Sequence, residues 1–495
     1  RSSDLGRNVF KIGDIIKAKS VQKRKSLAEK KKQVSQNVRP RKNSECELVI
    51  GLDFGTSSTK VVIQAPDLPG SPSSAVDFSH YAHPQMPYLM PTRLWVLPDG
   101  TCSLENCEGG QMVKDIKMGL IQDGNDLVGD YGHAWQLWSP EEVAACYLAF
   151  VLQYSRKWFL ETKQDLVGDF SKFIWSVNLG VPSPCVEDNE QNRIFRRVGK
   201  AAWMLSTLPE DEITLEMAKR KLRLAEDPEY WEGGSEDTCD FDIIPEIAAG
   251  AVGYALSDMR REGLHVIVDI GASTVDVCSF NLHNKEGNDR YSLLIADVQP
   301  LGAFRLYRDK LQTIKSTFER HIEEMLAKHD PLMPINLDDS IEAYIASSEQ
   351  LTAACAEARA KFKEKFLLMM RSVIWQTKCR RDPEATVWQK HGRLPILLIG
   401  GGSRLPFFCS AVGELDAWLR KYTSNEGITH QPVLLPNSLV HSAKRSDGHY
   451  YLTVTWGLSH RALDVGEIIP ADCIPDADPP PRRDWRSRFV SKDQV

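Results

Sequence analysis

Residues 53–61 read DFGTSSTKV, and residues 269–277 read DIGASTVDV. Aligned without a gap, the two stretches share Asp, Gly, Ser and Val, while Phe/Ile and Ser/Thr are close exchanges. Each stretch stands between two short apolar runs, a pattern typical of a strand, a turn and a returning strand. The copies begin 216 residues apart, about one domain length, which predicts two duplicated lobes that face each other.

The residue types of the two turns indicate a phosphate site. Gly lets the backbone N–H groups of a tight turn approach phosphate oxygens without a Cβ clash. Asp53 and Asp269 end their strands at the same place, where carboxylates would orient Mg²⁺ through its bound waters. Lys60 and Asp276 take equivalent positions, which puts opposite charges on the two sides of the predicted cleft. The remaining candidates are the turn residues Gly55, Thr56, Ser57, Ser58, Gly271, Ala272, Ser273 and Thr274.

The rest of the chain predicts an α/β fold, because apolar strand patterns alternate with helical ones. The segment Ser139-Pro140-Glu141 has the features of a helix start, with Ser at the N-cap and Pro in the first turn. Further helices are expected near 303–328 and 340–377, and the acidic stretch 209–242 is interpreted as an insertion with one short helix.

A third motif, residues 400–406, reads GGGSRLP and follows an apolar strand pattern at 394–399. A single Asp-x-Gly or glycine-rich loop is common in ordinary turns, but three such motifs in this order are specific. Together they resemble the actin, sugar-kinase and seventy-kilodalton heat-shock chaperone superfamily of two-lobed ATPases. The chain is most similar to the nucleotide-binding domain of those chaperones, over residues 48 to about 463.

The resemblance implies an α/β, two-lobed actin-like ATPase in which duplicated ribonuclease H-like lobes enclose a nucleotide cleft. In the chaperones the second loop reads Asp-x-Gly-Gly-Gly-Thr-x-Asp, whereas Ala272 and Ser273 stand here in place of two glycines. The third loop of the family holds the adenosine, and its Arg packs on the adenine. By resemblance, this role falls to Gly400, Gly401, Gly402, Ser403 and Arg404.

Two shorter matches add to the implied site. Asp115-Ile116-Lys117 is similar to the family's Asp-Ala-Lys, whose Lys reaches the γ-phosphate, and Glu246 is similar to a Glu near the magnesium and the attacking water. The resemblance thus implies ATP or ADP with Mg²⁺ as ligands. The implied catalytic set is Asp53, Lys117, Glu246, Asp269 and Asp276, of which Asp53 and Asp269 hold Mg²⁺ through water.

The sequence divides into a basic arm at 1–45, lobe I at 46–260 with the acidic insertion 209–242, lobe II at 261–446, a helix returning to lobe I at 447–465, and a Pro/Arg-rich tail at 466–495. Because only about thirty residues follow that helix, we expect a stand-alone protein without the chaperones' peptide-binding domain.

Protein partners are expected to bind through the arm, the insertion or the tail. Residues 1–43 carry fourteen Lys and Arg against three acidic residues, in a chain whose net charge is −6. Such a run could also bind nucleic acid by releasing counterions, although a solvated arm is the more ordinary interpretation.

The sequence also predicts a cellular setting. No apolar run approaches the roughly 20 residues needed to cross a bilayer, so no membrane span is expected. The eleven Cys are scattered without a zinc or disulfide pattern, which favours a cytoplasmic location.

Three functions are compatible with these motifs. The first is a slowly ATP-hydrolysing, chaperone-like switch that acts through partner proteins. The second is a small-molecule kinase of the sugar-kinase type, because residues 53–60 (DFGTSSTK) resemble the sugar-kinase loop even better than the chaperone loop. The third is a nucleotide-binding scaffold with weak turnover, or an actin-like protein.

Overall fold

Both repeated stretches fold as the β-hairpins expected of them. In the computed structural model, β1 (Glu45–Phe54) pairs antiparallel with β2 (Ser58–Gln64), and Asp53 lies opposite Lys60. In the second copy, β10 (Gly263–Ile270) pairs antiparallel with β11 (Val275–Lys285), and Asp269 lies opposite Asp276. The two hairpins therefore present equivalent positions, as their alignment predicted.

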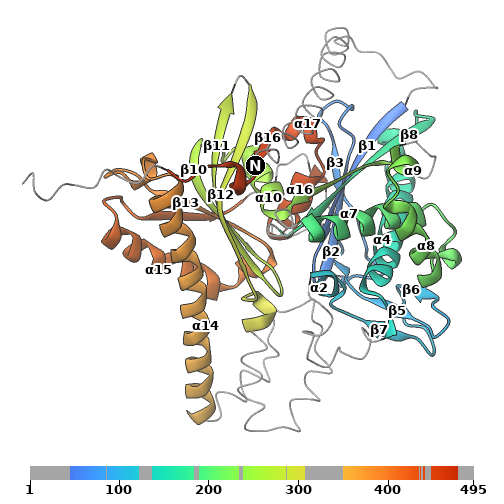
Figure 1. The fold of residues 1–495 in the computed structure, drawn as a ribbon, viewed down its shortest axis with the longest axis horizontal. Helices are drawn as coiled ribbons and strands as arrows, with labels where there is room; N and C mark the ends of the chain where they lie inside the picture. Colours follow the sequence, from blue (N-terminus) through green and yellow to red (C-terminus); the bar gives the residue numbers. More distant parts are fainter. Residues whose placement is uncertain are drawn as a thin grey trace, which may run out of the picture. The chain divides into compact units, whose positions relative to one another are not determined.

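The structure describes residues 45–84, 86–121, 137–182, 189–232, 238–285, 287–306, 349–433, 435, 439–440 and 448–477 (Figure 1). The predicted basic arm up to residue 44, the predicted tail beyond residue 477 and most of the helix predicted near 303–328 lie outside these residues. Nearly all described elements belong to one compact unit, Cys46–Val167 with Phe173–Val495. The other unit contributes only Glu45 and Gly168–Lys172 to the described residues.

The first sheet has seven strands in the order β15-β3-β2-β1-β8-β9, with β4 paired to β2. It is a mixed sheet, because β1, β2 and β3 pair antiparallel whereas β8 pairs parallel with β9 and β15 pairs parallel with β3. Its other strands are β3 (Ser73–Ala75), β4 (Met90–Pro91), β8 (Lys172–Val181), β9 (Asp240–Pro245) and β15 (Leu439–Val440).

The second sheet has six strands in the order β14-β13-β10-β11-β12-β16. It too is mixed: β10 pairs antiparallel with β11 but parallel with β13. Its remaining strands are β12 (Asn288–Gln299), β13 (Leu394–Ile399), β14 (Ile428–Pro432) and β16 (Glu467–Ile469). A small third sheet contains β5 (Leu94–Val96), β6 (Cys102–Ser103) and β7 (Gln111–Val113).

Helices accompany these sheets, so the described part of the chain is α/β, as predicted. The α-helices are α2 (Ile116–Ile121), α4 (Pro140–Thr162), α5 (Gln164–Val167), α7 (Asn189–Leu205), α8 (Leu215–Ala225), α9 (Pro228–Glu232), α10 (Glu246–Ala255), α14 (Glu349–Gln376), α15 (Pro406–Tyr422), α16 (Gly448–Leu458) and α17 (Ala462–Val465). Shorter turns are η1 (Glu210–Glu212), η2 (Thr377–Arg381), η3 (Thr386–Trp388), η4 (Gly401–Arg404) and η5 (Ala471–Cys473). None of the described helices is long and apolar enough to cross a membrane.

One local expectation needs correction. The acidic stretch 209–242 contains two α-helices, α8 and α9, and not one, and its end belongs to β9 of the first sheet. Thr214 caps α8 by accepting a hydrogen bond from the Met217 amide, which favours a helix there despite the acidic surroundings. At the start of α4, Ser139 is the N-cap and Pro140 stands in the first turn, as predicted, although the Ser139 side chain makes no capping hydrogen bond.

Helices α10 and α16 lie side by side between the two large sheets (Figure 1). Every residue of α10 is buried, as expected for a helix enclosed on all sides. The two helices approach closely because Gly457 has no side chain: a Cβ there would lie 2.0 Å from the Ala249 carbonyl oxygen. Their apolar side chains share one buried cluster with β10, β11, β12 and β13.

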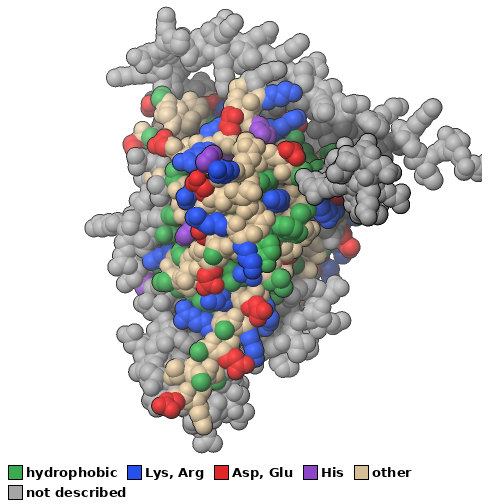
Figure 2. Space-filling model, turned by 90° about the vertical axis from the view of Figure 1, so that its left-hand side faces the viewer, with side chains coloured by type: hydrophobic (Ala, Val, Ile, Leu, Met, Phe, Trp, Pro, Cys, Tyr) green, Lys and Arg blue, Asp and Glu red, His purple; other side chains and the backbone are tan. Residues whose placement is uncertain are grey.

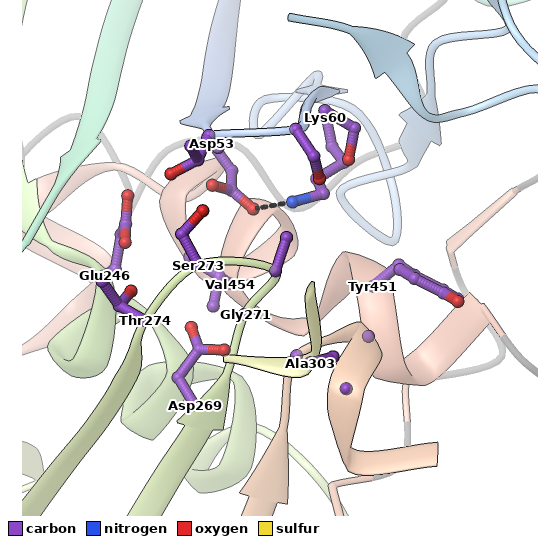
Figure 3. Close-up of a pocket in the computed structure, with 18 of the residues that line it drawn as sticks. Asp53, Lys60, Glu246, Asp269, Gly271, Ser273, Thr274, Ala303, Tyr451 and Val454 are labelled. Atoms are coloured by element: carbon purple, nitrogen blue, oxygen red, sulfur yellow. Dashed lines mark hydrogen bonds and ion pairs between the residues drawn. The ribbon is translucent and has the colours of Figure 1, made fainter. Parts of the chain in front are cut away.

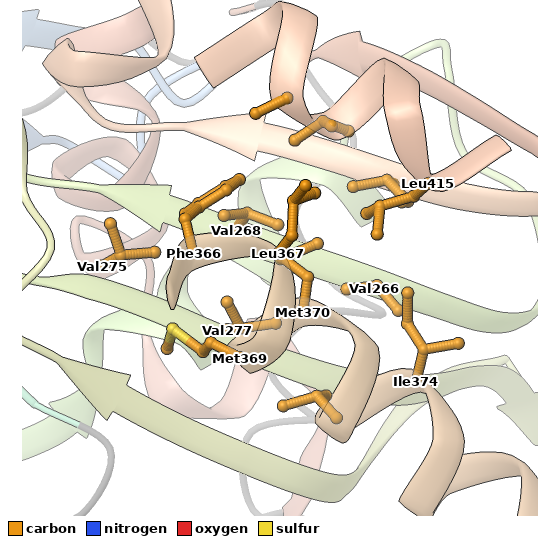
Figure 4. Packing of buried hydrophobic residues seen from close by; sticks show 14 of the residues in the cluster. Val266, Val268, Val275, Val277, Phe366, Leu367, Met369, Met370, Ile374 and Leu415 are labelled. Carbon is orange, nitrogen blue, oxygen red and sulfur yellow. The ribbon is translucent and has the colours of Figure 1, made fainter. Parts of the chain in front are cut away.

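The opposite face of the second sheet is covered by α14 and α15 (Figure 4). Phe366, Met370 and Ile374 on α14 recur at helical spacing and pack on Val266 and Val277 of β10 and β11. Helices α14 and α15 thus pack on one face of the second hairpin, and α10 packs on the other.

His265 on β10 should make stability depend on pH. Its Nδ1 donates to the Gly263 carbonyl at 2.8 Å and its Nε2 accepts from the Tyr254 hydroxyl at 3.1 Å, so the neutral ring satisfies both partners. Burial lowers the pKa of His265 to about 4, whereas the unfolded ring titrates near 6.5. The stabilisation is therefore complete above the unfolded pKa and is lost as the pH falls toward 4, by about 3 kcal/mol at most.

The measurement is urea unfolding at several pH values for the wild type and for His265→Phe. We expect the wild type to lose more stability than the variant between pH 7 and pH 4.5. Equal losses in both proteins would show that His265 does not titrate as described.

Candidate functional site

The turns of the two hairpins line one pocket together with the loop after β13 (Figure 3). The predicted site residues that line it are Asp53, Gly55, Thr56, Ser57, Ser58, Lys60, Lys117, Glu246, Asp269, Gly271, Ala272, Ser273, Thr274, Asp276, Gly400, Gly401 and Gly402. Segments far apart in the sequence are thus brought to one place. Ser403 and Arg404 stand behind this lining and do not face the pocket directly.

Each lysine of the pocket is paired with one carboxylate. Lys60 Nζ lies 3.0 Å from Asp53 Oδ2, across the β1–β2 pair. Lys117 Nζ lies 2.6 Å from Glu246 Oε1, and both side chains are almost fully buried. No such cation pairs with Asp269 or Asp276 among the residues that the structure describes.

The second hairpin therefore holds two buried carboxyl groups without a paired cation. Burial, helped by Glu246 and Asp53, raises the pKa of Asp269 to about 7. Burial, with the charges of Asp269 and Glu246, raises the pKa of Asp276 well above its usual range. The Oδ1 atom of Asp276 is buried without a hydrogen-bond partner among the described residues. A bound cation would stabilise both carboxylates.

The buried ion pair has its own electrostatic signature. Burial acts to lower the pKa of Lys117, but the charges of Glu246, Asp53 and Asp276 outweigh it and raise that pKa. Burial raises the pKa of Glu246, and Lys117 offsets only part of that shift. Lys117 thus remains charged, and its ammonium group interacts favourably with the carboxylates of Glu246, Asp53 and Asp276.

Local backbone geometry positions Lys117 and Glu246. Asp115, just before α2, has a φ of 54°, a left-handed conformation that non-glycine residues adopt at a cost. Its carbonyl accepts the Gly119 amide at 3.1 Å, so α2 begins at this turn and carries Lys117 inward. Glu246 is the first residue of α10 and directly follows β9 of the first sheet, which places its carboxylate beside Lys117.

The third loop depends on a glycine at residue 400. Gly400 has a φ of 80°, and a Cβ there would lie 2.2 Å from Asp269 Oδ1 and 2.5 Å from the Ile270 carbonyl oxygen. The Ser403 hydroxyl donates to the Gly400 carbonyl at 2.6 Å, which closes the turn. The loop thereby presses against the Asp269 carboxylate.

Arg404 reaches the pocket through an aromatic residue. Its Nη1 donates to the Tyr451 hydroxyl at 3.0 Å, and its guanidinium carbon lies 5.7 Å from the centre of that ring. Gly401 lies beneath the same ring, since a Cβ there would be 2.3 Å from Tyr451 Cε1. Tyr451 therefore forms the surface of the pocket that the sequence assigned to Arg404.

Sequence reasoning missed the lining residues Leu89, Ala303, Tyr450, Tyr451 and Val454. Three of these come from α16, which the sequence predicted only as a returning helix. Ala303 lines the pocket because its amide donates to the Gly271 carbonyl at 3.0 Å, and the Phe304 amide donates to the Ala272 carbonyl at 2.7 Å. No motif marks these positions, although the paired tyrosines at 450–451 are an unusual feature of a buried helix.

The residues present fit a phosphate group with a hydrated divalent cation. Carboxylate oxygens are the ligands that Mg²⁺ prefers, and it commonly keeps several waters, so few carboxylates are needed. Among the described residues no group of three or more His, Cys, Asp or Glu lies close enough to hold a metal directly. Hydroxyls, glycine turns and two lysines beside the carboxylates match the donors that bind phosphate oxygens.

Gly400→Ala should lower the free energy of unfolding by about 1–3 kcal/mol, because the new methyl group meets Asp269 and the backbone is left-handed. Gly413→Ala in α15 is the matched control: its nearest neighbour would be 4.0 Å away, and alanine favours a helix. Denaturant unfolding measures both. Equal stability of Gly400→Ala and the wild type would contradict the close packing of this loop on Asp269.

Asp269→Asn should stabilise the ligand-free protein above pH 7. Because the folded pKa is raised, the stability is full below the unfolded pKa near 3.9, falls as the pH rises from there, and is fully lost once the pH has passed the folded pKa of about 7. The amide removes that loss, so its advantage in melting temperature should be larger at pH 8.5 than at pH 6. If the variant were stabilised equally at both pH values, the pKa of Asp269 would not be raised as described.

No protein-family model matches this chain. Its function is accordingly inferred from the residues and geometry of the pocket.

Proposed function

We propose that the chain binds an adenine nucleotide with Mg²⁺ in this pocket, hydrolyses ATP slowly and acts as a chaperone-like switch on partner proteins. The observation that carries the proposal is the meeting of two equivalent Asp-x-Gly turns around four carboxylates and only two lysines. Such a site attracts a divalent cation and offers turn amides to the phosphates beside it.

The residues divide by position in the pocket. The turns around Gly55 and Gly271 would hold the β- and γ-phosphates, and Lys117 would face the γ-phosphate. Asp53 and Asp269 would hold Mg²⁺ through its waters. When bound, Mg²⁺ neutralises charge that develops on the phosphates during transfer. Glu246, already paired with Lys117, would orient an attacking water.

The nucleoside would lie at the other end of the pocket. Figure 3 shows Tyr451 well apart from the group formed by Asp53, Glu246 and Asp269. A planar base gains from stacking on an aromatic ring or a guanidinium plane. Tyr451 lines the pocket and offers such a ring, which Arg404 holds from behind, and this supports an adenine site next to the Gly400–Gly402 loop.

The finer fold assignment is part of the same proposal. The equivalent hairpins, with α10 and α16 between two mixed sheets, are the arrangement expected of a two-lobed actin-like ATPase with duplicated ribonuclease H-like lobes. Closure of the cleft around nucleotide would then be the motion that partners sense. The cytoplasmic location and the role of the basic arm remain predictions.

One observation favours the kinase alternative. Lys60, on the second strand of the first hairpin, lies 3.0 Å from Asp53 and so places a second cation beside the expected phosphates. A kinase would transfer the γ-phosphoryl group only when a sugar-like acceptor is present. The switch needs no acceptor, because water takes its place.

Calorimetric titration of the purified full-length protein with ATP, with and without Mg²⁺, tests binding. We expect Mg²⁺ to tighten binding, and Asp269→Asn to remove that gain because the ion loses a charged partner. Asp99→Asn, the same substitution on an exposed turn, should behave like the wild type. If Asp269→Asn binds Mg²⁺–ATP as the wild type does, the assignment is wrong.

Phosphate release without an added acceptor tests turnover. Lys117→Met should lower the rate by about 100-fold, the scale expected for losing one positioned charge. Release only after sugars are added would favour the kinase, and tight binding without release would indicate the scaffold.

A further inference from the structure

Large apolar side chains stand exposed on the outer face of α14 and α15. Leu368, Trp375 and Tyr422 are 67%, 44% and 51% exposed, and Trp418 beside them is partly buried. We call these four residues the aromatic ladder. They play no part in the nucleotide pocket, so a role for the ladder does not depend on the proposed function.

The ladder has a regular geometry. The Arg371 guanidinium lies 5.8 Å from the Trp418 ring, and four residues further along both helices the Trp375 and Tyr422 rings are 6.5 Å apart. Equal steps on α14 and α15 mean that the two helices run parallel here, with side chains facing in successive rungs. Trp418 and Tyr422 also contact each other, with ring centres 5.7 Å apart.

The exposed side chains of the ladder are not required to fill the hydrophobic core under α14. Phe366, Met370 and Ile374 occupy the buried face of the same stretch of α14 and already fill the space against the second sheet (Figure 4). Leu368 and Trp375 point away from that face. Trp375, Tyr422 and Trp418 are contiguous through their ring contacts. Contiguous exposed apolar surface marks interaction sites, and Trp, Tyr and Arg are enriched at the centres of interfaces.

The charges around the ladder are basic. Arg371 lies over Trp418 and Lys421 lies 5.5 Å from the Tyr422 ring, and neither forms an ion pair with any described residue. The Nε atom of Arg371 is buried and has no hydrogen-bond partner in the described part of the chain. Residues 349–433 contain thirteen Lys and Arg against eight Asp and Glu, although the whole chain is acidic.

Figure 2 views the side of the molecule on which α14 and α15 lie, and Lys and Arg side chains are scattered over it beside hydrophobic ones. A partner that covers the ladder must therefore supply apolar groups and negative charge together.

We infer that the aromatic ladder docks an acidic segment of a partner protein that also carries apolar side chains. Such a segment would bury the rings and give Arg371 and Lys421 carboxylate partners. A nucleic acid fits less well, because the two cations already cover faces of Trp418 and Tyr422 on which bases would stack.

The test uses the full-length protein and fluorescence anisotropy with a labelled amphipathic peptide of about 16 residues, roughly four helical turns. The peptide carries Leu along one face and Glu on the others, and a second peptide carries Lys in place of each Glu. We expect the Glu peptide to bind and the Lys peptide not to bind. The double variant Trp375→Ala/Tyr422→Ala should weaken binding by roughly tenfold or more, and Lys421→Glu should weaken it further at low salt.

Ile174→Ala is the matched apolar control, because that side chain is 43% exposed on β8 of the other sheet. Lys219→Glu on α8 is the charge control. Both controls should bind like the wild type, and melting curves should show every variant folded. Equal binding of both peptides, tighter binding of a thymidine oligonucleotide, or self-association that the double variant abolishes would each overturn the assignment.

Discussion

The contact on which the rest of the structure depends is the close approach of α16 to both sheets through glycines. A Cβ on Gly51 of β1 would lie 2.4 Å from the Thr455 carbonyl oxygen, and one on Gly457 would lie 2.0 Å from the Ala249 carbonyl oxygen. Helix α16 can therefore rest directly on the first sheet and on α10, which in turn packs on β13 at Gly250. Larger residues would push the two hairpins apart.

That spacing has an electrostatic consequence. It buries Asp269 and Asp276 close to Glu246 of the other side. Burial, with the charge of Glu246, raises the pKa of both aspartates. The ligand-free pocket thus stores unfavourable energy in buried carboxylates, a common property of functional sites. A cation with phosphates would relieve it and would thereby couple ligand binding to the arrangement of the two sheets.

Much of this was accessible from sequence because it rests on local patterns. The two hairpins followed from apolar strands around Asp-x-Gly turns, and β13 with its glycine loop from residues 394–406. The burial of Lys117 was not accessible, since a lone lysine is usually exposed and only the Glu246 pair, 129 residues away, makes its burial possible. Tyr451 was missed for a similar reason: its place depends on how α16 lies over Gly401, which no local pattern encodes. Helix α9, the second helix of the acidic stretch, was not predicted because its short, acidic sequence resembles a loop.

The most direct test of the central claim is a crystal structure of the full-length protein soaked with a non-hydrolysable ATP analogue and Mn²⁺, read by anomalous diffraction. We expect one Mn²⁺ peak between the hairpins, about 4 Å from the Asp53 and Asp269 carboxylates as water-mediated contact requires. The phosphates should lie against the Gly55 and Gly271 turns, with the base beside Tyr451. A nucleotide bound elsewhere, or phosphates in this pocket without the metal, would contradict it.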